Sequence, residues 1–115
     1  MHLTLRLLLL IMLLLTAMAL GARTWGHQAP SGWTYPNECC SGHQDCAEIP
    51  ASAVRGLADG WHVDLPANVH PRGFPVRAVY PYSDGKIRRS GDGQFHLCIR
   101  PNGEVLCLYV PPGAA

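Results

Sequence analysis

The chain has 115 residues, with 9 Lys and Arg side chains against 8 Asp and Glu, and a formal net charge of +1. This balance excludes a strong electrostatic field, so we expect neither a nucleic-acid partner nor charge-driven binding to a membrane surface. The length is that of one domain. A chain this short buries a limited fraction of its surface, so covalent crosslinks would matter for its stability.

Residues 1–22 have the composition of a secretory signal peptide. Arg6 ends a short positive region, Leu7 to Leu15 is an uninterrupted apolar run, and small residues follow up to Ala22. These three parts, in this order, are typical of a leader that is removed on export. The run is shorter than the about 20 apolar residues of a membrane span; an uncleaved anchor is the alternative. Cleavage after Ala22 would leave 115 minus 22, or 93 residues, in the periplasm or outside the cell and without membrane attachment.

The rest of the chain predicts a small, mainly β domain. Residues 23–36 are rich in Gly, Pro, Ser and Trp without a period, which indicates an irregular N-terminal arm. Pro36 to Cys46 is a turn-rich, cysteine-rich segment. Strands are expected at Val54–Leu57, at Trp61–Leu65 after an Asp-Gly turn, and at Val76–Tyr80. With a C-terminal hairpin, residues 37–115 should form about four or five short antiparallel strands stapled by disulfides.

The C-terminal hairpin is the clearest local signal. Asn102-Gly103 separates two alternating apolar runs between Phe95 and Val110, a pattern that favours a two-residue turn. In that register Cys98 lies opposite Cys107. The pleat then places one set of side chains on a core face, namely Phe95, Leu97, Ile99, Leu106, Leu108 and Val110. The other face carries His96, Cys98, Arg100, Val105, Cys107 and Tyr109.

Five cysteines in an exported chain predict a disulfide framework. The candidates are Cys39, Cys40, Cys46, Cys98 and Cys107. Two arrangements remain open at this stage: a direct Cys98–Cys107 bridge across the hairpin, or bridges from the cysteine-rich segment to one or both hairpin cysteines. An odd number leaves one thiol over, which would be buried or would join two chains as a dimer.

A metal site is the alternative interpretation of the same residues. Cys40, His43 and Cys46, extended by His96 and Cys98, offer thiolate and imidazole ligands suited to zinc or copper. The chain lacks the paired C-x-x-C turns common in structural zinc sites, so we expect neither a metal nor another cofactor. A leftover thiol with His62 or His96 as base would be a nucleophile, but no spacing in the sequence brings these residues together. We therefore expect a domain that is not an enzyme.

The cysteine motifs resemble those of a group of small exported bacterial proteins. The residues that carry the resemblance are Tyr35 to Cys46, His96-Leu-Cys-Ile99 and Cys107 to Pro111. The group, common among alphaproteobacteria and uncharacterised, shares a segment that begins Cys-Cys-Ser and ends Asp-Cys, and a His-x-Cys-Ile strand. The resemblance implies export and small size but no activity. Members with a further cysteine before the His-x-Cys strand differ from this chain, which has Arg89-Ser90-Gly91 there.

Overall fold

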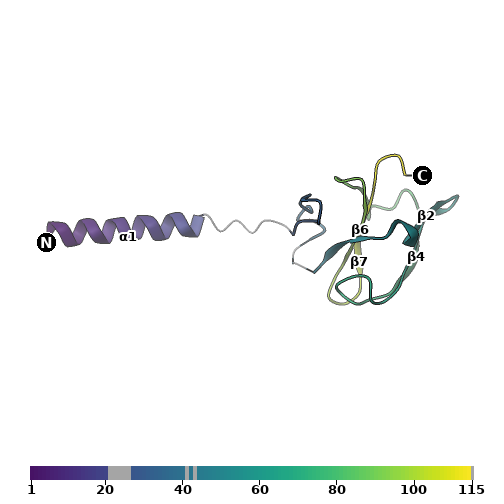
Figure 1. Ribbon diagram of the computed structural model, residues 1–115, viewed down its shortest axis with the longest axis horizontal. Helices are drawn as coiled ribbons and strands as arrows, with labels where there is room; N and C mark the ends of the chain where they lie inside the picture. Colours follow the sequence, from purple (N-terminus) through teal and green to yellow (C-terminus); the bar gives the residue numbers. More distant parts are fainter. Residues whose placement is uncertain (21–26, 41, 43, 115) are drawn as a thin grey trace.

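The computed structural model describes residues 1–20, 27–40, 42 and 44–114. It begins with one helix, α1 (His2–Leu20), drawn in purple in Figure 1, whose side chains are exposed as far as Met18. Within the described ranges, no helix meets the combined demands of length and apolarity that a membrane span makes. The expected cleavage site at Ala22 and the first residues of the arm lie outside the described residues.

The domain is mainly β, as predicted, and its strands form two sheets (Figure 1). The four-stranded sheet has the order β1-β6-β7-β5, with β1 (Cys46–Ile49), β5 (Ile87–Arg89), β6 (Phe95–Ile99) and β7 (Val105–Val110). The three-stranded sheet has the order β2-β3-β4, with β2 (Val54–Leu57), β3 (Gly60–Leu65) and β4 (Val76–Tyr80), and the short 3-10 helix η1 (Ala51–Ala53) precedes it.

Two features of these sheets differ from the prediction. The described residues form seven strands rather than four or five, because no strand was predicted at β1 and the residues of β5 were expected to be loop. In addition, β5 pairs with β7 in parallel, with Ile87 opposite Leu108, whereas every strand was expected to be antiparallel. Both strands are short and carry charged residues, so neither shows the alternation that identifies a strand in a sequence.

The three-stranded sheet follows the prediction closely. β2 and β3 form an antiparallel hairpin, and β3 pairs antiparallel with β4. Gly60 begins β3 at φ 139°, and a Cβ there would lie 2.2 Å from the Tyr80 carbonyl oxygen. Only glycine therefore allows β3 to start so close to the end of β4.

The C-terminal hairpin has a three-residue loop, not the predicted two-residue turn. Gly103 N–H donates to the Arg100 carbonyl at 2.9 Å, Arg100 N–H donates to the Glu104 carbonyl at 2.8 Å, and Gly103 has φ 90°. No described residue other than glycine has positive φ, so Asn102 does not adopt the conformation that a type I′ turn requires. Pro101 explains the difference, because its fixed φ suits the second position of a type I turn.

A bulge at Leu106 then corrects the register. Ile99 lies opposite Val105, but Cys98 lies opposite Cys107, which leaves Leu106 as the extra residue. The predicted opposition of the two cysteines is thus confirmed. The faces of two residues are reversed, since Val105 packs against the main core and Leu106 against the cysteines.

Within the four-stranded sheet, β6 is buried on both faces, and all five of its residues are buried. On one face it shares a core with the three-stranded sheet, formed by Ile49, Ala53, Val54, Trp61, Val63, Leu65, Val76, Tyr80, Phe95, Leu97, Ile99, Leu108 and Val110. The opposite face is covered by the arm and the cysteine-rich segment. That second cluster contains Ala29, Tyr35, Cys39, Cys40, Cys46, Cys98, Cys107 and Tyr109.

Candidate functional site: the buried cysteine and histidine clusters

Both described disulfides join the cysteine-rich segment to the C-terminal hairpin. Cys39 is bonded to Cys107 across 68 residues, and Cys46 to Cys98 across 52. The structure thus takes the second of the two arrangements that the sequence left open. The direct bridge does not form: Cys98 and Cys107 lie opposite each other, yet each is bonded to a different residue of the segment.

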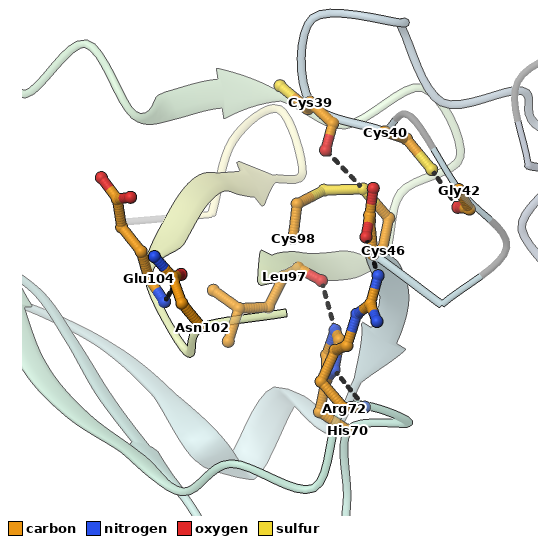
Figure 2. A network of polar contacts seen from close by, with 11 residues as sticks. Cys39, Cys40, Gly42, Cys46, His70, Arg72, Leu97, Cys98, Asn102 and Glu104 are labelled. Carbon is orange, nitrogen blue, oxygen red and sulfur yellow. Dashed lines mark hydrogen bonds and ion pairs between the residues drawn. A yellow bond between two sulfur atoms is a disulfide. The ribbon is translucent and has the colours of Figure 1, made fainter. Parts of the chain in front are cut away.

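The sheet explains this pairing. Cys46 begins β1 and lies directly opposite Cys98 of β6, with their Cα atoms 4.0 Å apart. Cys98 therefore has a cysteine on each neighbouring strand, and it is bonded to the one on β1. Cys39 approaches from the covering segment and reaches Cys107 with a Cα separation of 5.9 Å. Figure 2 shows the Cys46 sulfur beside the Cys39 carbonyl oxygen, at 3.3 Å.

Cys40 is the cysteine left over, and it is buried rather than offered to solvent. Its side chain is 2 % exposed, and the thiol donates to the Gly42 carbonyl at 3.1 Å (Figure 2). Burial raises the pKa of the thiol above its usual value. A neutral, covered thiol is a poor nucleophile, and a disulfide between two chains through Cys40 would need this segment to open first.

Three of the five residues of the alternative metal-ligand set are engaged in other bonds. Cys46 and Cys98 are bonded to each other, so neither offers a thiolate. His96 uses both ring nitrogens in hydrogen bonds, and His43 lies outside the described residues. Within the part of the chain that the structure describes, no group of three or more His, Cys, Asp or Glu could hold a metal ion. The Cys46–Cys98 disulfide thus uses two of the five residues of the alternative ligand set.

His96 forms the centre of a buried polar network that the sequence did not reveal. Its Nε2–H donates to Asp92 Oδ1 at 2.7 Å, and its Nδ1 accepts from the Tyr35 hydroxyl at 2.8 Å. The His96 side chain is 0 % exposed and that of Asp92 6 %. The Trp33 ring packs edge-on against His96 at 5.0 Å between centroids, so the arm covers the network.

Asp92 ties this network to the arm. It also accepts from the Ser31 hydroxyl at 2.5 Å, the Ser90 hydroxyl at 2.9 Å and the Gln94 N–H at 3.1 Å. Burial would raise the pKa of Asp92, but these donors and His96 outweigh it and hold the pKa well below its usual range. Burial and the Asp92 charge in turn raise the pKa of Tyr35. The network therefore anchors the arm, and the Trp33 ring lies against its central histidine.

A second buried histidine fastens the proline-rich loop between β3 and β4. His70 is 2 % exposed; its Nε2–H donates to the Leu97 carbonyl at 2.9 Å and its Nδ1 accepts from the Arg72 N–H at 3.1 Å. Arg72 forms an ion pair with the buried Asp45, the residue before Cys46. The prolines around His70 are typical of a loop, and nothing in that composition indicates that the histidine is buried.

His62, the other histidine considered as a base, lies on β3 and is far more accessible. Its Nε2–H donates to Asp59 Oδ1 at 2.6 Å, and this contact lowers the pKa of the carboxyl group. The hydrogen bond belongs to the turn between β2 and β3 and involves no cysteine.

Comparisons of the chain with protein-family models, with curated proteins and with solved structures found no significant match.

Proposed function

We propose that this protein is an exported domain, periplasmic or secreted, with a structural or binding role rather than a catalytic one. The observation that carries the proposal is the pair of disulfides, which fastens the cysteine-rich segment over the C-terminal hairpin. Structural disulfides form and persist in oxidising compartments and are rare in the cytosol. The covalent framework of the domain is therefore suited to life outside the cytoplasm.

The N-terminal helix supports export. α1 contains the apolar run from Leu7 to Leu15, and its side chains are exposed as far as Met18. A helix of this composition exposes apolar surface that water disfavours. A short apolar helix between Arg6 and a run of small residues is what a signal peptide presents to the export machinery. The resemblance of the cysteine motifs to those of small exported bacterial proteins points in the same direction.

The positions of the reactive groups support a role without catalysis. The thiol of Cys40 is buried with a raised pKa, and His96 is sealed beneath Trp33. Catalytic groups must reach a substrate, whereas these groups hold elements of the domain together. A partner would therefore contact the outer surface of the domain, while the cysteine and histidine clusters keep that surface rigid.

Expression of the full chain in a Gram-negative host, followed by fractionation and intact-mass measurement, tests the proposal. We expect a periplasmic or secreted product that begins near Arg23, lacks four hydrogen atoms relative to the reduced chain, two for each disulfide, and carries no metal. A Leu10→Arg variant, which interrupts the apolar run, should remain unprocessed inside the cell. An unprocessed wild-type chain with five free thiols would contradict the proposal, and stoichiometric zinc or copper would favour a metal-binding protein.

A further inference from the structure

His70 is held in one protonation state by two hydrogen-bond partners, one an acceptor and the other a donor. The Leu97 carbonyl can only accept a hydrogen bond, so Nε2 must carry a proton. The Arg72 backbone N–H can only donate, so Nδ1 must not carry one. Since the ring is 2 % exposed, water cannot replace either partner while the ring stays in place. The closed geometry therefore requires a neutral imidazole.

The charges around His70 do not compensate for a second proton. Arg72 of the same loop repels an imidazolium, whereas Asp45, the residue before β1, favours it through its carboxylate and its backbone carbonyl. That carbonyl already accepts from the Ile99 N–H at 2.7 Å. Asp45, however, is already in an ion pair with Arg72. From β6 the ring meets the Leu97 carbonyl. Burial is the largest influence on His70, and it lowers the pKa of the imidazole.

These same contacts fasten the loop to the rest of the domain. His70 ties residues 66–75 to β6, and Arg72 ties them to the cysteine-rich segment beside the Cys46–Cys98 disulfide (Figure 2). The closed arrangement is not fully satisfied, because Arg72 Nε is buried without a hydrogen-bond partner among the described residues. A buried donor without a partner costs free energy, which brings the open arrangement closer to the closed one.

We propose that the loop of residues 66–75 is an acid-released latch, closed when His70 is neutral and opened by its protonation. A proton on Nδ1 would point at the Arg72 N–H and oppose the Arg72 guanidinium, so the imidazolium leaves its site. Its departure releases the Leu97 carbonyl and frees the loop to carry Arg72 away from Asp45. The proton comes from solvent, and no covalent bond changes.

The other buried histidine shows why this behaviour belongs to His70. His96 faces the Asp92 carboxylate on one side and the Tyr35 hydroxyl on the other. A hydroxyl can accept as well as donate, so His96 can take a second proton without losing a partner. The Arg72 N–H, which can only donate, is therefore the partner that distinguishes the surroundings of His70 from those of His96.

Linkage gives the size of the effect. If His70 binds its proton only in the open loop, with an ordinary pKa of about 6.5, the opening equilibrium grows tenfold for each pH unit below that value. Between pH 7.5 and pH 5 it should therefore increase about 30-fold. Since opening breaks the bond between the Arg72 N–H and His70 Nδ1, the Arg72 amide reports the change directly.

Hydrogen exchange of the oxidised protein, corrected for the intrinsic pH dependence of exchange, tests the latch. We expect the protection of the Arg72 amide to fall about 30-fold between pH 7.5 and pH 5. His70→Gln cannot take a proton and lacks the ring nitrogen that accepts from the Arg72 N–H. The Arg72 amide of this variant should therefore be less protected at both pH values, and its protection should not change with pH. His62→Gln, which removes an accessible histidine on β3, should behave as the wild type.

Imidazole nitrogen shifts in the wild-type protein give a second measurement that does not depend on a variant folding. We expect His70 in the closed protein to be the neutral Nε2–H tautomer at pH 6. Protection of the Arg72 amide that is constant from pH 7.5 to pH 5 would overturn the proposal. So would an equal fall in protection between these pH values in His70→Gln, or titration of His70 without any change at Arg72.

Discussion

Removing the outer disulfide, Cys39–Cys107, isolates the contribution of one staple. We consider the double variant Cys39→Ala with Cys107→Ala, in which the inner Cys46–Cys98 bridge remains. The two bridges are nested, spanning 68 and 52 residues, so the outer bridge closes a ring of only 68 minus 52, or 16, further residues once the inner one exists. In the chain-entropy model, closing a loop of that length stabilises the folded state by about 3 kcal/mol.

The nesting also predicts how much stability is lost when the inner bridge, or both bridges, are removed. Removing the inner bridge alone should also cost about 3 kcal/mol, because the same short ring decides the entropy of the second closure. Removing both should cost about 7 kcal/mol, since the last bridge then closes a loop of 52 residues and contributes about 4 kcal/mol. Because whole domains are stable by about 5–15 kcal/mol, either single-bridge variant should fold and the fully reduced domain should be marginal.

Urea unfolding of the mature chain at pH 7, followed by tryptophan fluorescence, measures these differences. The matched control is Cys40→Ala, which removes a buried thiol of the same cluster without touching a bridge. It should cost about 1 kcal/mol, the scale of one small buried group. The reasoning is refuted if the outer-bridge variant loses no more stability than this control, or if the two single-bridge variants differ by as much as the whole contribution of one bridge.

Three further predictions concern the arm, the sheet and the free thiol. Asp92→Asn should destabilise the domain by about 2 kcal/mol at pH 7; because the folded-state pKa of Asp92 is depressed, this difference should be full above the ordinary pKa of 3.8 and shrink as unfolding is repeated toward pH 2. Gly60→Ala places a Cβ 2.2 Å from the Tyr80 carbonyl oxygen and should lower the free energy of unfolding in urea by about 3 kcal/mol. Gly85→Ala is the control, because its Cβ meets no atom within 4 Å and should change stability by about 0.5 kcal/mol or less. Equal losses in the two variants would contradict the packing argument. Cys40 should resist iodoacetamide in the native protein and react after denaturation, as mass spectrometry can show, and rapid native labelling would contradict its burial.

The elements that the sequence predicted well are those fixed by local patterns. The β2–β3 hairpin follows from an Asp-Gly turn beside an alternating run, and β4 from a short apolar run between prolines. The C-terminal hairpin shows the limit of such patterns. Pro101 lengthens the loop by one residue, which shifts the pairing of the two strands, and the bulge at Leu106 restores the predicted register beyond it. Cys98 therefore still lies opposite Cys107, while Val105 and Leu106 lie on the faces opposite to those predicted.

The disulfide pairing and the buried histidines could not be predicted because they depend on contacts between distant parts of the chain. Cys46 meets Cys98 only because β1 lies beside β6, and four residues that include one glutamate give no clear strand signal. His70 lies in a proline-rich segment whose composition indicates an exposed loop. Its burial depends on Arg72 reaching Asp45, 27 residues away in sequence, which no spacing rule anticipates.

Peptide mapping of the bridges tests the central claim most directly. Cleavage after Glu38, Glu48 and Glu104 and before Asp45 and Asp92 separates the bonded cysteines into four fragments, residues 39–44, 45–48, 92–104 and 105–115. Digestion of the oxidised protein, after alkylation under denaturing conditions, should yield fragment 39–44 joined to 105–115 and fragment 45–48 joined to 92–104, with the alkyl group on Cys40. Fragment 92–104 joined to 105–115 would mean a direct bridge across the hairpin and would contradict the account.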